Sequence, residues 1–361
     1  MTAAPQSGSG SSEQVSNVNP NLNRHSSTGP PKLRPTDEYV AGITEGDRVV
    51  LSQAITLLES TRAEHRARAQ SVVNACLPEA GGSLRVAVTG VPGVGKSTFI
   101  EALGPSLLDA DHRLAVLAID PSSEQSRGSI LGDKTRMGGL AGHDDVYIRP
   151  SPTSGHLGGV ARRSRETIFL CEAAGYDLVF VETVGVGQSE VSVRSMVDVF
   201  LLLALAGAGD QLQGIKRGIV EMADVLAINK ADGENRTAAR RARAEYERAL
   251  ELLGAPEDDW TVPVLTCSAE TGEGLSEVWA AVRRFRTHAE ETGAFEQRRR
   301  NQARHWMHQT IEDALRNDFY DTPAVEDARP DLEARVERGE LSSVAAAERL
   351  LEVYRSALAD R

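Results

Sequence analysis

The hydrophobic positions of the chain fall into short apolar runs separated by segments of helical period. The runs cover residues 84–88, 114–119, 177–181, 199–203, 225–228 and 262–265, and helical segments such as 160–174 and 237–253 lie between them. This alternation predicts an α/β fold built on a doubly wound, mostly parallel sheet. In such a sheet the ligand is expected at the carboxyl ends of the strands.

The two ends of the chain depart from this pattern. Residues 1–35 are rich in Ser, Gly, Asn and Pro, so we expect a disordered tail. Residues 36–82 predict a helical arm, either packed on the central domain or left as a solvated linker helix. After the central domain, 83–290, residues 291–361 carry apolar side chains at helical spacing, including Ala303, Met307, Ile311 and Leu315. This stripe fits either an intramolecular core or a dimer interface.

Charge and cysteine usage narrow the class of protein. The chain has 40 basic and 52 acidic residues. The net charge of −12 therefore argues against an overall basic surface that would bind nucleic acid or an anionic membrane. The cysteines Cys76, Cys171 and Cys267 have no metal-ligand spacing and favour a reducing compartment. The longest apolar run, 197–208, contains Asp198 and is too short to span a bilayer. We therefore expect a soluble, cytoplasmic protein.

A phosphate-binding pattern, G-x-x-x-x-G-K-[ST], follows the first apolar run and precedes a helical segment. It consists of Gly90, Val91, Pro92, Gly93, Val94, Gly95, Lys96, Ser97 and Thr98. Glycines let backbone N–H groups turn toward a polyphosphate, and the helix N-terminus adds a positive dipole. Lys96 can reach the β and γ oxygens and Ser97 can ligate Mg²⁺. An ordinary glycine turn is the alternative. Such a turn needs neither a strand before it nor a helix after it, so the flanking elements favour the phosphate loop.

A second pattern, at the end of the run 225–228, indicates guanine. Asn229, Lys230 and Asp232 match N-K-x-D, in which a carboxylate accepts hydrogen bonds from the N1–H and the exocyclic amine of guanine. Adenine offers no such pair of donors on that edge. Downstream, Ser268 and Ala269 resemble the companion box whose backbone amide contacts guanine O6. Together with the phosphate loop, these residues favour GTP over ATP.

Acidic residues near the ends of other apolar runs predict a magnesium site. Glu182 and Gly185 occupy the place of a D-x-x-G motif, with Glu in place of the usual Asp. The carboxylate can hold the water shell of Mg²⁺ and the glycine amide can bond the γ-phosphate; a strand-end carboxylate capping the next turn is the alternative. Asp120 and Asp133 supply two more oxygen ligands suited to Mg²⁺.

The central motifs of the chain resemble those of the MeaB/ArgK family. They are DPSS at 120–123, GSILGDKTRM at 128–137, ETVGVGQSE at 182–190, GAGDQLQGIKRGI at 207–219 and NKADG at 229–233. The resemblance covers about residue 36 to the C-terminus. It implies a SIMIBI-class P-loop GTPase with helical extensions at both ends and homodimerisation through the C-terminal one.

The same resemblance implies a function and a partner. Family members accompany adenosylcobalamin-dependent methylmalonyl-CoA mutase as G-protein chaperones. They gate cobalamin transfer to the mutase, let damaged cofactor leave, and hydrolyse GTP weakly until the mutase stimulates them. We therefore expect GTP/GDP and Mg²⁺ as ligands and methylmalonyl-CoA mutase, or a related acyl-CoA mutase, as partner.

Residue roles carried over from the family add two catalytic candidates to Lys96 and Glu182. Gln188 is a candidate for orienting the attacking water, although an exposed loop amide is the alternative. Residues 207–216 resemble the extra switch loop of the family, with Asp210, Gln213 and Lys216 as polar members, or a plain hinge. The chain departs from the family pattern at Arg127, usually Gly, and at Ala206, often Pro.

Three other functions fit the sequence less well. A nickel metallochaperone would need His-rich or Cys-containing sites, but the eight histidines are scattered. A kinase linked to amino-acid transport would need an acceptor pocket, and the guanine pattern argues against ATP. A membrane-targeting GTPase of the signal-recognition type would need a Met-rich domain, which five methionines do not provide.

Overall fold

The computed structural model describes residues 33–60, 62–119, 137–150, 157–183, 189–206, 217–253 and 259–359. Residues 36–361 form one compact unit. The predicted tail, 1–35, falls almost wholly outside the described residues. The described part contains no helix that is both long and apolar enough to cross a membrane.

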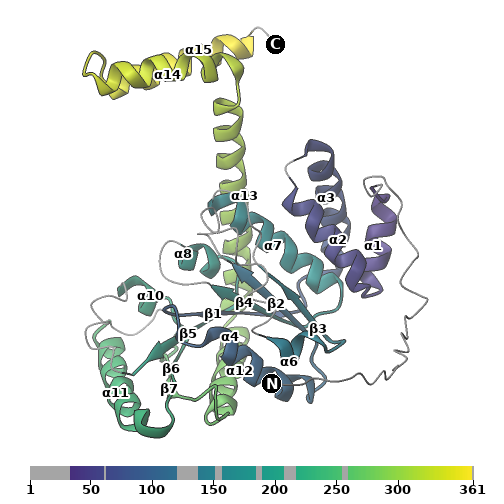
Figure 1. The fold of residues 1–361 in the computed structure, drawn as a ribbon, viewed down its shortest axis with the longest axis vertical. Coiled ribbons are helices and arrows are strands. Elements are labelled where there is room, and N and C mark those ends of the chain that lie inside the picture. The colour runs from purple at the N-terminus through teal and green to yellow at the C-terminus, as the bar shows by residue number, and fades with distance from the viewer. Residues whose placement is uncertain are drawn as a thin grey trace, which may run out of the picture. The chain divides into compact units, whose positions relative to one another are not determined.

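A seven-stranded sheet forms the centre of this unit (Figure 1). Its strand order is β3-β2-β4-β1-β5-β6-β7, and every neighbouring pair is parallel. The strands are β1 (Leu84–Thr89), β2 (Leu114–Ile119), β3 (Val146–Arg149), β4 (Leu178–Thr183), β5 (Val199–Leu205), β6 (Val225–Asn229) and β7 (Val264–Thr266). The doubly wound parallel sheet is therefore confirmed.

The differences from the predicted strands lie at their ends and at one edge of the sheet. β4 continues to Thr183, so Glu182 lies within the strand and not after it. β7 begins and ends later than the predicted run 262–265. β3 had no counterpart among the predicted strands, because it has only four residues, of which Val146 and Tyr147 are buried.

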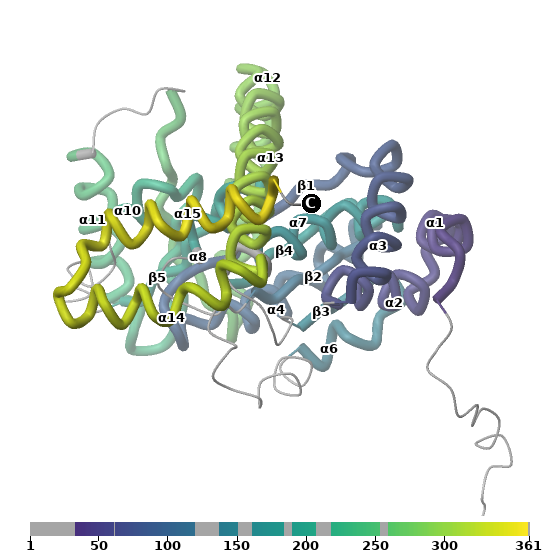
Figure 2. The backbone as a smooth tube through the Cα atoms, turned by 90° about the horizontal axis from the view of Figure 1, so that it is seen from above, coloured from purple at the N-terminus to yellow at the C-terminus, as the bar shows by residue number. Residues whose placement is uncertain are grey.

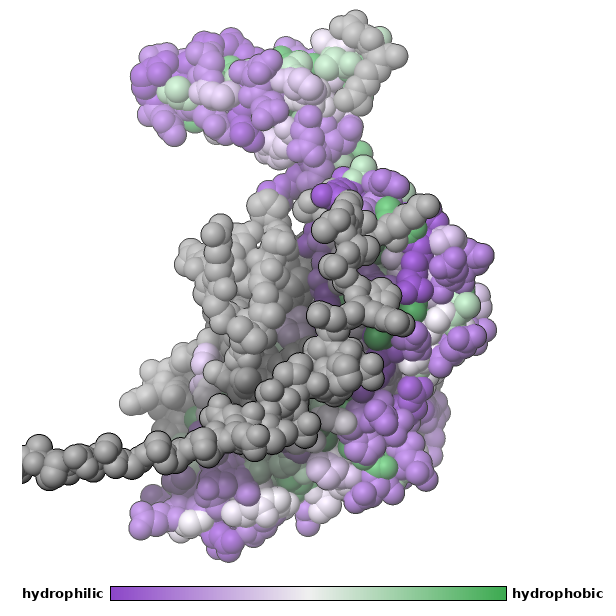
Figure 3. All heavy atoms as spheres, turned by 45° about the vertical axis from the view of Figure 1, so that its right-hand side comes forward, coloured by the Kyte–Doolittle hydropathy of each residue, from purple (hydrophilic) through white to green (hydrophobic). Residues whose placement is uncertain are grey.

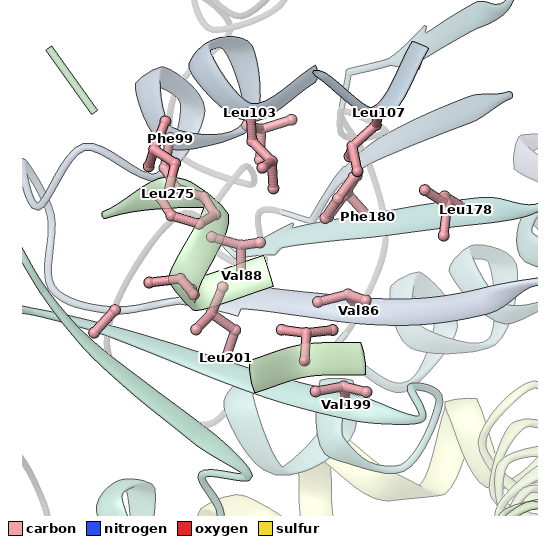
Figure 4. Packing of buried hydrophobic residues seen from close by; sticks show 14 of the residues in the cluster. Val86, Val88, Phe99, Leu103, Leu107, Leu178, Phe180, Val199, Leu201 and Leu275 are labelled. Atoms are coloured by element: carbon pink, nitrogen blue, oxygen red, sulfur yellow. The ribbon is translucent and has the colours of Figure 1, made fainter. Parts of the chain in front are cut away.

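Helices cover both faces of the sheet. One face carries α4 (Lys96–Leu108), α6 (Gly138–Ala141) and α12 (Leu275–Glu291), and the other carries α7 (Leu157–Ala173) and α8 (Ser189–Arg194). α10 (Arg217–Glu221) packs on α11 (Arg236–Leu253), which lies against β6 and β7. On the first face the buried side chains of β1, β4 and β5 meet those of α4 and α12 (Figure 4), which gives the sheet edge a fixed support.

The N-terminal segment, for which the sequence predicts a helical arm, contains three short helices. α1 (Thr36–Thr44), α2 (Arg48–Glu59) and α3 (Ala63–Cys76) pack on one another and on α7. Asp47 begins α2 by accepting hydrogen bonds from the amides of Val49 and Val50, and this cap breaks the segment. The short helix η1 (Leu77–Glu79) leads into β1. The arm is thus packed on the central domain and is not a solvated linker.

The C-terminal segment consists of α13 (Ala294–Tyr320), α14 (Pro323–Glu337) and α15 (Ser343–Ala359). α14 and α15 lie side by side as an antiparallel pair (Figures 1 and 2). Met307, Ile311 and Leu315 on α13 are 54, 48 and 62% exposed, so their stripe is not an intramolecular core in this chain. The surface of the α14–α15 pair is mainly hydrophilic with scattered hydrophobic side chains (Figure 3).

Candidate functional site

The polar residues singled out in the sequence gather at the carboxyl edge of the sheet. The loop 90–95 follows β1, Glu182 is the penultimate residue of β4, and Asn229 ends β6. Ser268 lies just beyond β7. Because these strands are parallel and lie close together in the sheet, their ends bring residues that are far apart in the chain to one site.

The loop between β1 and α4 requires glycine at two positions. Gly90 has φ 145°, and a Cβ there would lie 2.2 Å from the carbonyl oxygen of Leu203. Gly95 has φ 96°, and a Cβ there would lie 2.8 Å from the side-chain nitrogen of Asn229. The loop is therefore packed against β5 and β6 with no room for a side chain at these two positions. It leads into α4, whose first turn has no side-chain cap, so its backbone amides suit an anion.

Lys96 lies folded over this loop. Its Nζ donates hydrogen bonds to the carbonyl oxygens of Gly90, at 2.9 Å, and Val91, at 3.2 Å, and the residue is buried. Burial lowers the pKa of Lys96, while the carboxylates of Glu182 and Glu190 act to raise it. The ammonium group is thus held over the loop by two backbone carbonyls, within reach of an anion that the loop amides bind.

Ser97 and Glu182 form the oxygen-donor pair of the site. The Ser97 hydroxyl donates to Glu182 Oε1 at 2.6 Å, although the residues come from α4 and β4. Beside them, the hydroxyls of Thr89 and Thr183 are 2.9 Å apart and hydrogen-bonded, which joins the ends of β1 and β4. Hydroxyl and carboxylate oxygens fit Mg²⁺, an ion that keeps several waters and takes phosphate oxygens. The described residues include no cluster of three or more His, Cys, Asp or Glu that would bind a metal without such help.

Asn229 connects the phosphate loop to the segment after β7. Its Nδ2 donates to the Val94 carbonyl at 2.8 Å, and its Oδ1 accepts from the Ala269 amide at 3.0 Å. The side chain is buried, so these bonds fix the spacing between the two loops. The Ala269 amide already donates to Asn229 within the protein. A purine oxygen would therefore have to share this donor or accept from a neighbouring amide.

Asp232 is held in place by Ser268. The Ser268 hydroxyl donates a short hydrogen bond to Asp232 Oδ2, and the Thr271 amide donates to Ser268 Oγ at 3.2 Å. Lys230 adopts φ 60°, a left-handed conformation that turns the chain between Asn229 and Asp232. The Asp232 carboxylate is therefore oriented by the protein, with acceptor capacity left for a ligand.

Five predicted site residues fall outside the described residues. They are Asp120, Asp133, Gly185, Gln188 and Lys216, together with the rest of the loop 207–216. The structure brings together the other predicted residues, from Gly90 to Thr98, Glu182, Asn229, Lys230, Asp232, Ser268 and Ala269, at one edge of the sheet.

One residue of this edge was not among the predicted ones. Glu190, in the first turn of α8, is only 2% exposed, and its charge acts on Lys96. A glutamate at the start of a short helix is usually on the surface, so hydrophobic periodicity does not mark it. Its only sequence signal is that it ends the motif ETVGVGQSE.

Comparison with known proteins identifies the family of the chain. Residues 51–324 match the family described as methylmalonyl Co-A mutase-associated GTPase MeaB. A probable GTPase of Mycobacterium tuberculosis is 53% identical over 88% of this chain and 94% of its own length. GTPase ArgK of Escherichia coli is 48% identical over 78% of this chain and 86% of its own length.

Two further relatives extend the comparison. A mouse protein, the mitochondrial methylmalonic aciduria type A homolog, is 45% identical over 89% of this chain and 80% of its own length. The crystal structure of an LAO/AO transport system kinase matches with a TM-score of 0.71 and 37% identity, and it covers 90% of this chain and 100% of that one. The chain is therefore a P-loop protein that belongs to the MeaB family of methylmalonyl-CoA mutase-associated GTPases.

Proposed function

We propose that the chain is a Mg²⁺-dependent, GTP-hydrolysing G-protein chaperone for an adenosylcobalamin-dependent methylmalonyl-CoA mutase or a related acyl-CoA mutase. In this role it gates delivery of the cofactor and protects or reactivates the mutase. The observation that carries the GTPase part is the joining of three elements at one edge. The phosphate loop, the Ser97–Glu182 pair and the Asn229–Asp232 segment are connected by hydrogen bonds.

The phosphate half of the site consists of residues 90–98. Backbone amides of this loop and of the first turn of α4 bind the polyphosphate. Lys96 Nζ exchanges the carbonyls of Gly90 and Val91 for β and γ oxygens, since it already lies over the loop. Ser97 and Glu182, with Asp120 and Asp133, hold Mg²⁺, which neutralises charge on the phosphates when bound. Gly185 supplies an amide to the γ-phosphate.

The base half of the site selects guanine. Asp232 accepts hydrogen bonds from the N1–H and the exocyclic amine, while the Ser268 hydroxyl keeps the carboxylate in place. Asn229 holds this half at a fixed distance from the phosphate loop. Lys230 and Ala269 complete the walls around the base. Adenine would leave the Asp232 carboxylate without the paired donors, which favours GTP.

Two residues outside the described part complete the proposal. Gln188 orients the attacking water, and Lys216, in the switch loop 207–216, responds to the mutase. The family name supports a mutase as partner. The exposed stripe of Met307, Ile311 and Leu315 on α13 supports a homodimer through the C-terminal helices, because monomers rarely leave such apolar rows in water.

The test is GTP turnover by the purified chain with and without a purified adenosylcobalamin-dependent mutase. The proposal expects slow turnover alone and a clear increase on mixing, with no increase from a mutase-free control protein of similar size. Loading of the mutase with adenosylcobalamin should then depend on GTP. An unchanged GTP turnover with methylmalonyl-, isobutyryl- and ethylmalonyl-CoA mutases would contradict the chaperone role.

A further inference from the structure

α13 is attached to the rest of the unit at the turn between α8 and β5. Gln302 Nε2 donates to the Val197 carbonyl at 2.7 Å and, more weakly, to the Arg194 carbonyl at 3.3 Å. Trp306 Nε1 donates to the Ser195 carbonyl at 2.8 Å. Side chains from one long helix thus satisfy carbonyls at the end of α8 and in the turn after it, and we call this set of contacts the α13 clamp.

The clamp is buried and reinforced by charge. Gln302 is 8% and Trp306 3% exposed, so their hydrogen bonds are shielded from water. Next to them, Arg194 pairs with both oxygens of Asp224, at 2.5 and 2.9 Å, and Arg298 of α13 reaches the same carboxylate at 3.2 and 3.3 Å. Breaking a buried contact of this kind leaves polar groups unpaired, so the end of α8 is firmly held.

The other end of α8 carries Glu190, which lies in the first turn and is almost fully buried. The charge of Glu190 acts to raise the pKa of Lys96. α8 also packs on β1 and β4, the strands that carry the phosphate loop and Glu182. A helix of six residues is only about 9 Å long, so its two ends move together. The position of Glu190 is therefore tied to the position of α13.

We infer that Gln302 and Trp306 of α13 are positioning residues for GTP hydrolysis, acting through α8 on Glu190 and Lys96. The inference rests on the proposed function, in which Lys96 contacts the β and γ oxygens. It makes the C-terminal helix, which also leads to α14 and α15, a structural part of the hydrolytic site. A change in the bound phosphates would alter the position of α13. In turn, a partner bound to the C-terminal helices would alter the geometry around the phosphates.

The primary test compares Gln302→Met with Gln309→Met in the full-length chain. Methionine keeps the length of the side chain but removes the donors to Val197 and Arg194. Gln309 lies on the same helix, and among the described residues its side-chain hydrogen bond is to Asp313, four residues on, so it is a matched control. Trp306→Phe is a second variant, because it removes the donor to Ser195 and keeps an aromatic ring.

The inference predicts a selective loss in both clamp variants. kcat for GTP should fall by about 10-fold or more, since misplacement of a catalytic group by about 1 Å can cost about 100-fold. Affinity for GDP should stay within about twofold, because Asp232 and Ser268 are not in contact with the clamp. The preference for a non-hydrolysable GTP analogue over GDP should fall, and Gln309→Met should behave as wild type.

A double variant tests the route through Glu190. If Gln302→Met acts by displacing Glu190, then Glu190→Gln and Gln302→Met together should reduce kcat by less than the product of the single losses. Hydrogen exchange of the intact chain gives an independent readout. Replacing GDP by the GTP analogue should change protection of residues 189–198 and 301–310 together, and Gln302→Met should uncouple the two segments.

Three outcomes separate the possibilities. Wild-type kcat in Gln302→Met and Trp306→Phe would overturn the inference. Equal losses of GDP and GTP-analogue affinity would also overturn it, because they would indicate general destabilisation. A wild-type chain that neither binds nor hydrolyses GTP would instead contradict the proposed function.

Discussion

Ser97 and Glu182 are 85 positions apart in the chain, yet the hydroxyl of one donates to the carboxylate of the other at 2.6 Å. The bond joins the first turn of α4 to the end of β4. It places two hard oxygen ligands beside the phosphate loop, where they are proposed to hold Mg²⁺.

Glu182→Gln should weaken the response to magnesium. The amide keeps the shape of the side chain and one acceptor oxygen but removes the charge. We expect the Mg²⁺ concentration for half-maximal GTP hydrolysis to rise by about 10-fold or more, a usual loss when a ligand or its support is changed. Glu277→Gln, on an exposed turn of α12, is the control. Identical magnesium titrations for the two variants would remove Glu182 from the metal site.

Lys96→Met should nearly abolish hydrolysis while leaving guanine recognition. Loss of one charged donor to a transition state typically costs about 100- to 1,000-fold in kcat. The base half of the site, at Asn229 and Asp232, does not contact the ammonium group in this structure, so GDP binding should weaken much less. Single-turnover hydrolysis and equilibrium binding of labelled GDP measure the two effects separately. A kcat within threefold of wild type would contradict the role of Lys96.

Asp232→Asn should change the choice of base. The carboxylate is replaced by an amide that cannot accept from both guanine donors, so affinity for GDP should fall by about 10- to 100-fold, the value of a charge-assisted hydrogen bond. An amide N–H can instead donate to the O2 of xanthine, and XDP should bind this variant better than wild type. The measurement is competition of GDP, XDP and ADP for a fluorescent nucleotide. Unaltered selectivity would show that Asp232 does not face the base.

A buried ion pair should make stability dependent on acid pH. Burial alone would raise the pKa of Glu172, but bonds from Arg85, Ser83 and the Gly81 amide outweigh it and hold the pKa below its ordinary value of 4.5. Because the folded-state pKa is depressed, this stabilisation is complete above the unfolded-state pKa. It is lost as the pH falls from about 4.5 through the folded-state value.

The test is thermal unfolding of Glu172→Ala between neutral and acid pH. The variant should lose about 3–5 kcal/mol near pH 7, because Arg85 is left buried without its partner. The difference from wild type should shrink as the pH falls below 4.5. Glu290→Ala, which breaks an exposed pair with Arg286, should cost at most about 0.5 kcal/mol. Equal melting temperatures for the two variants at pH 7 would contradict this account.

The central sheet and the phosphate loop could be predicted because their signals are local. The run at 84–88 is apolar apart from Arg85, whose side chain is buried in a pair with Glu172, and the strand is buried along its whole length, as a strand covered on both faces requires. Gly90 and Gly95 stand where no Cβ fits. Asn229 and Asp232 were found by their spacing. Because β1 and β6 are parallel, the residues that follow them are expected at the same edge of the sheet. In the structure, Asn229 contacts the phosphate loop at the Val94 carbonyl.

Features that depend on packing between distant segments could not be predicted in this way. The Met307–Ile311–Leu315 row has the spacing of a core, and only the path of α13 leaves it exposed. Glu190 is buried in the first turn of α8, and its charge acts on Lys96, which lies 94 positions earlier in the chain. Gln302 gives no sequence signal, since its partners are backbone carbonyls of the α8–β5 turn.

Calorimetric titration of the full-length chain, with Mg²⁺ present, measures the guanine specificity on which the other predictions depend. We predict heat on adding GDP and a GTP analogue, with ADP at least about 100-fold weaker, as expected when the Asp232 carboxylate loses its paired donors. No heat from guanine nucleotides, or equal affinity for GDP and ADP, would contradict it.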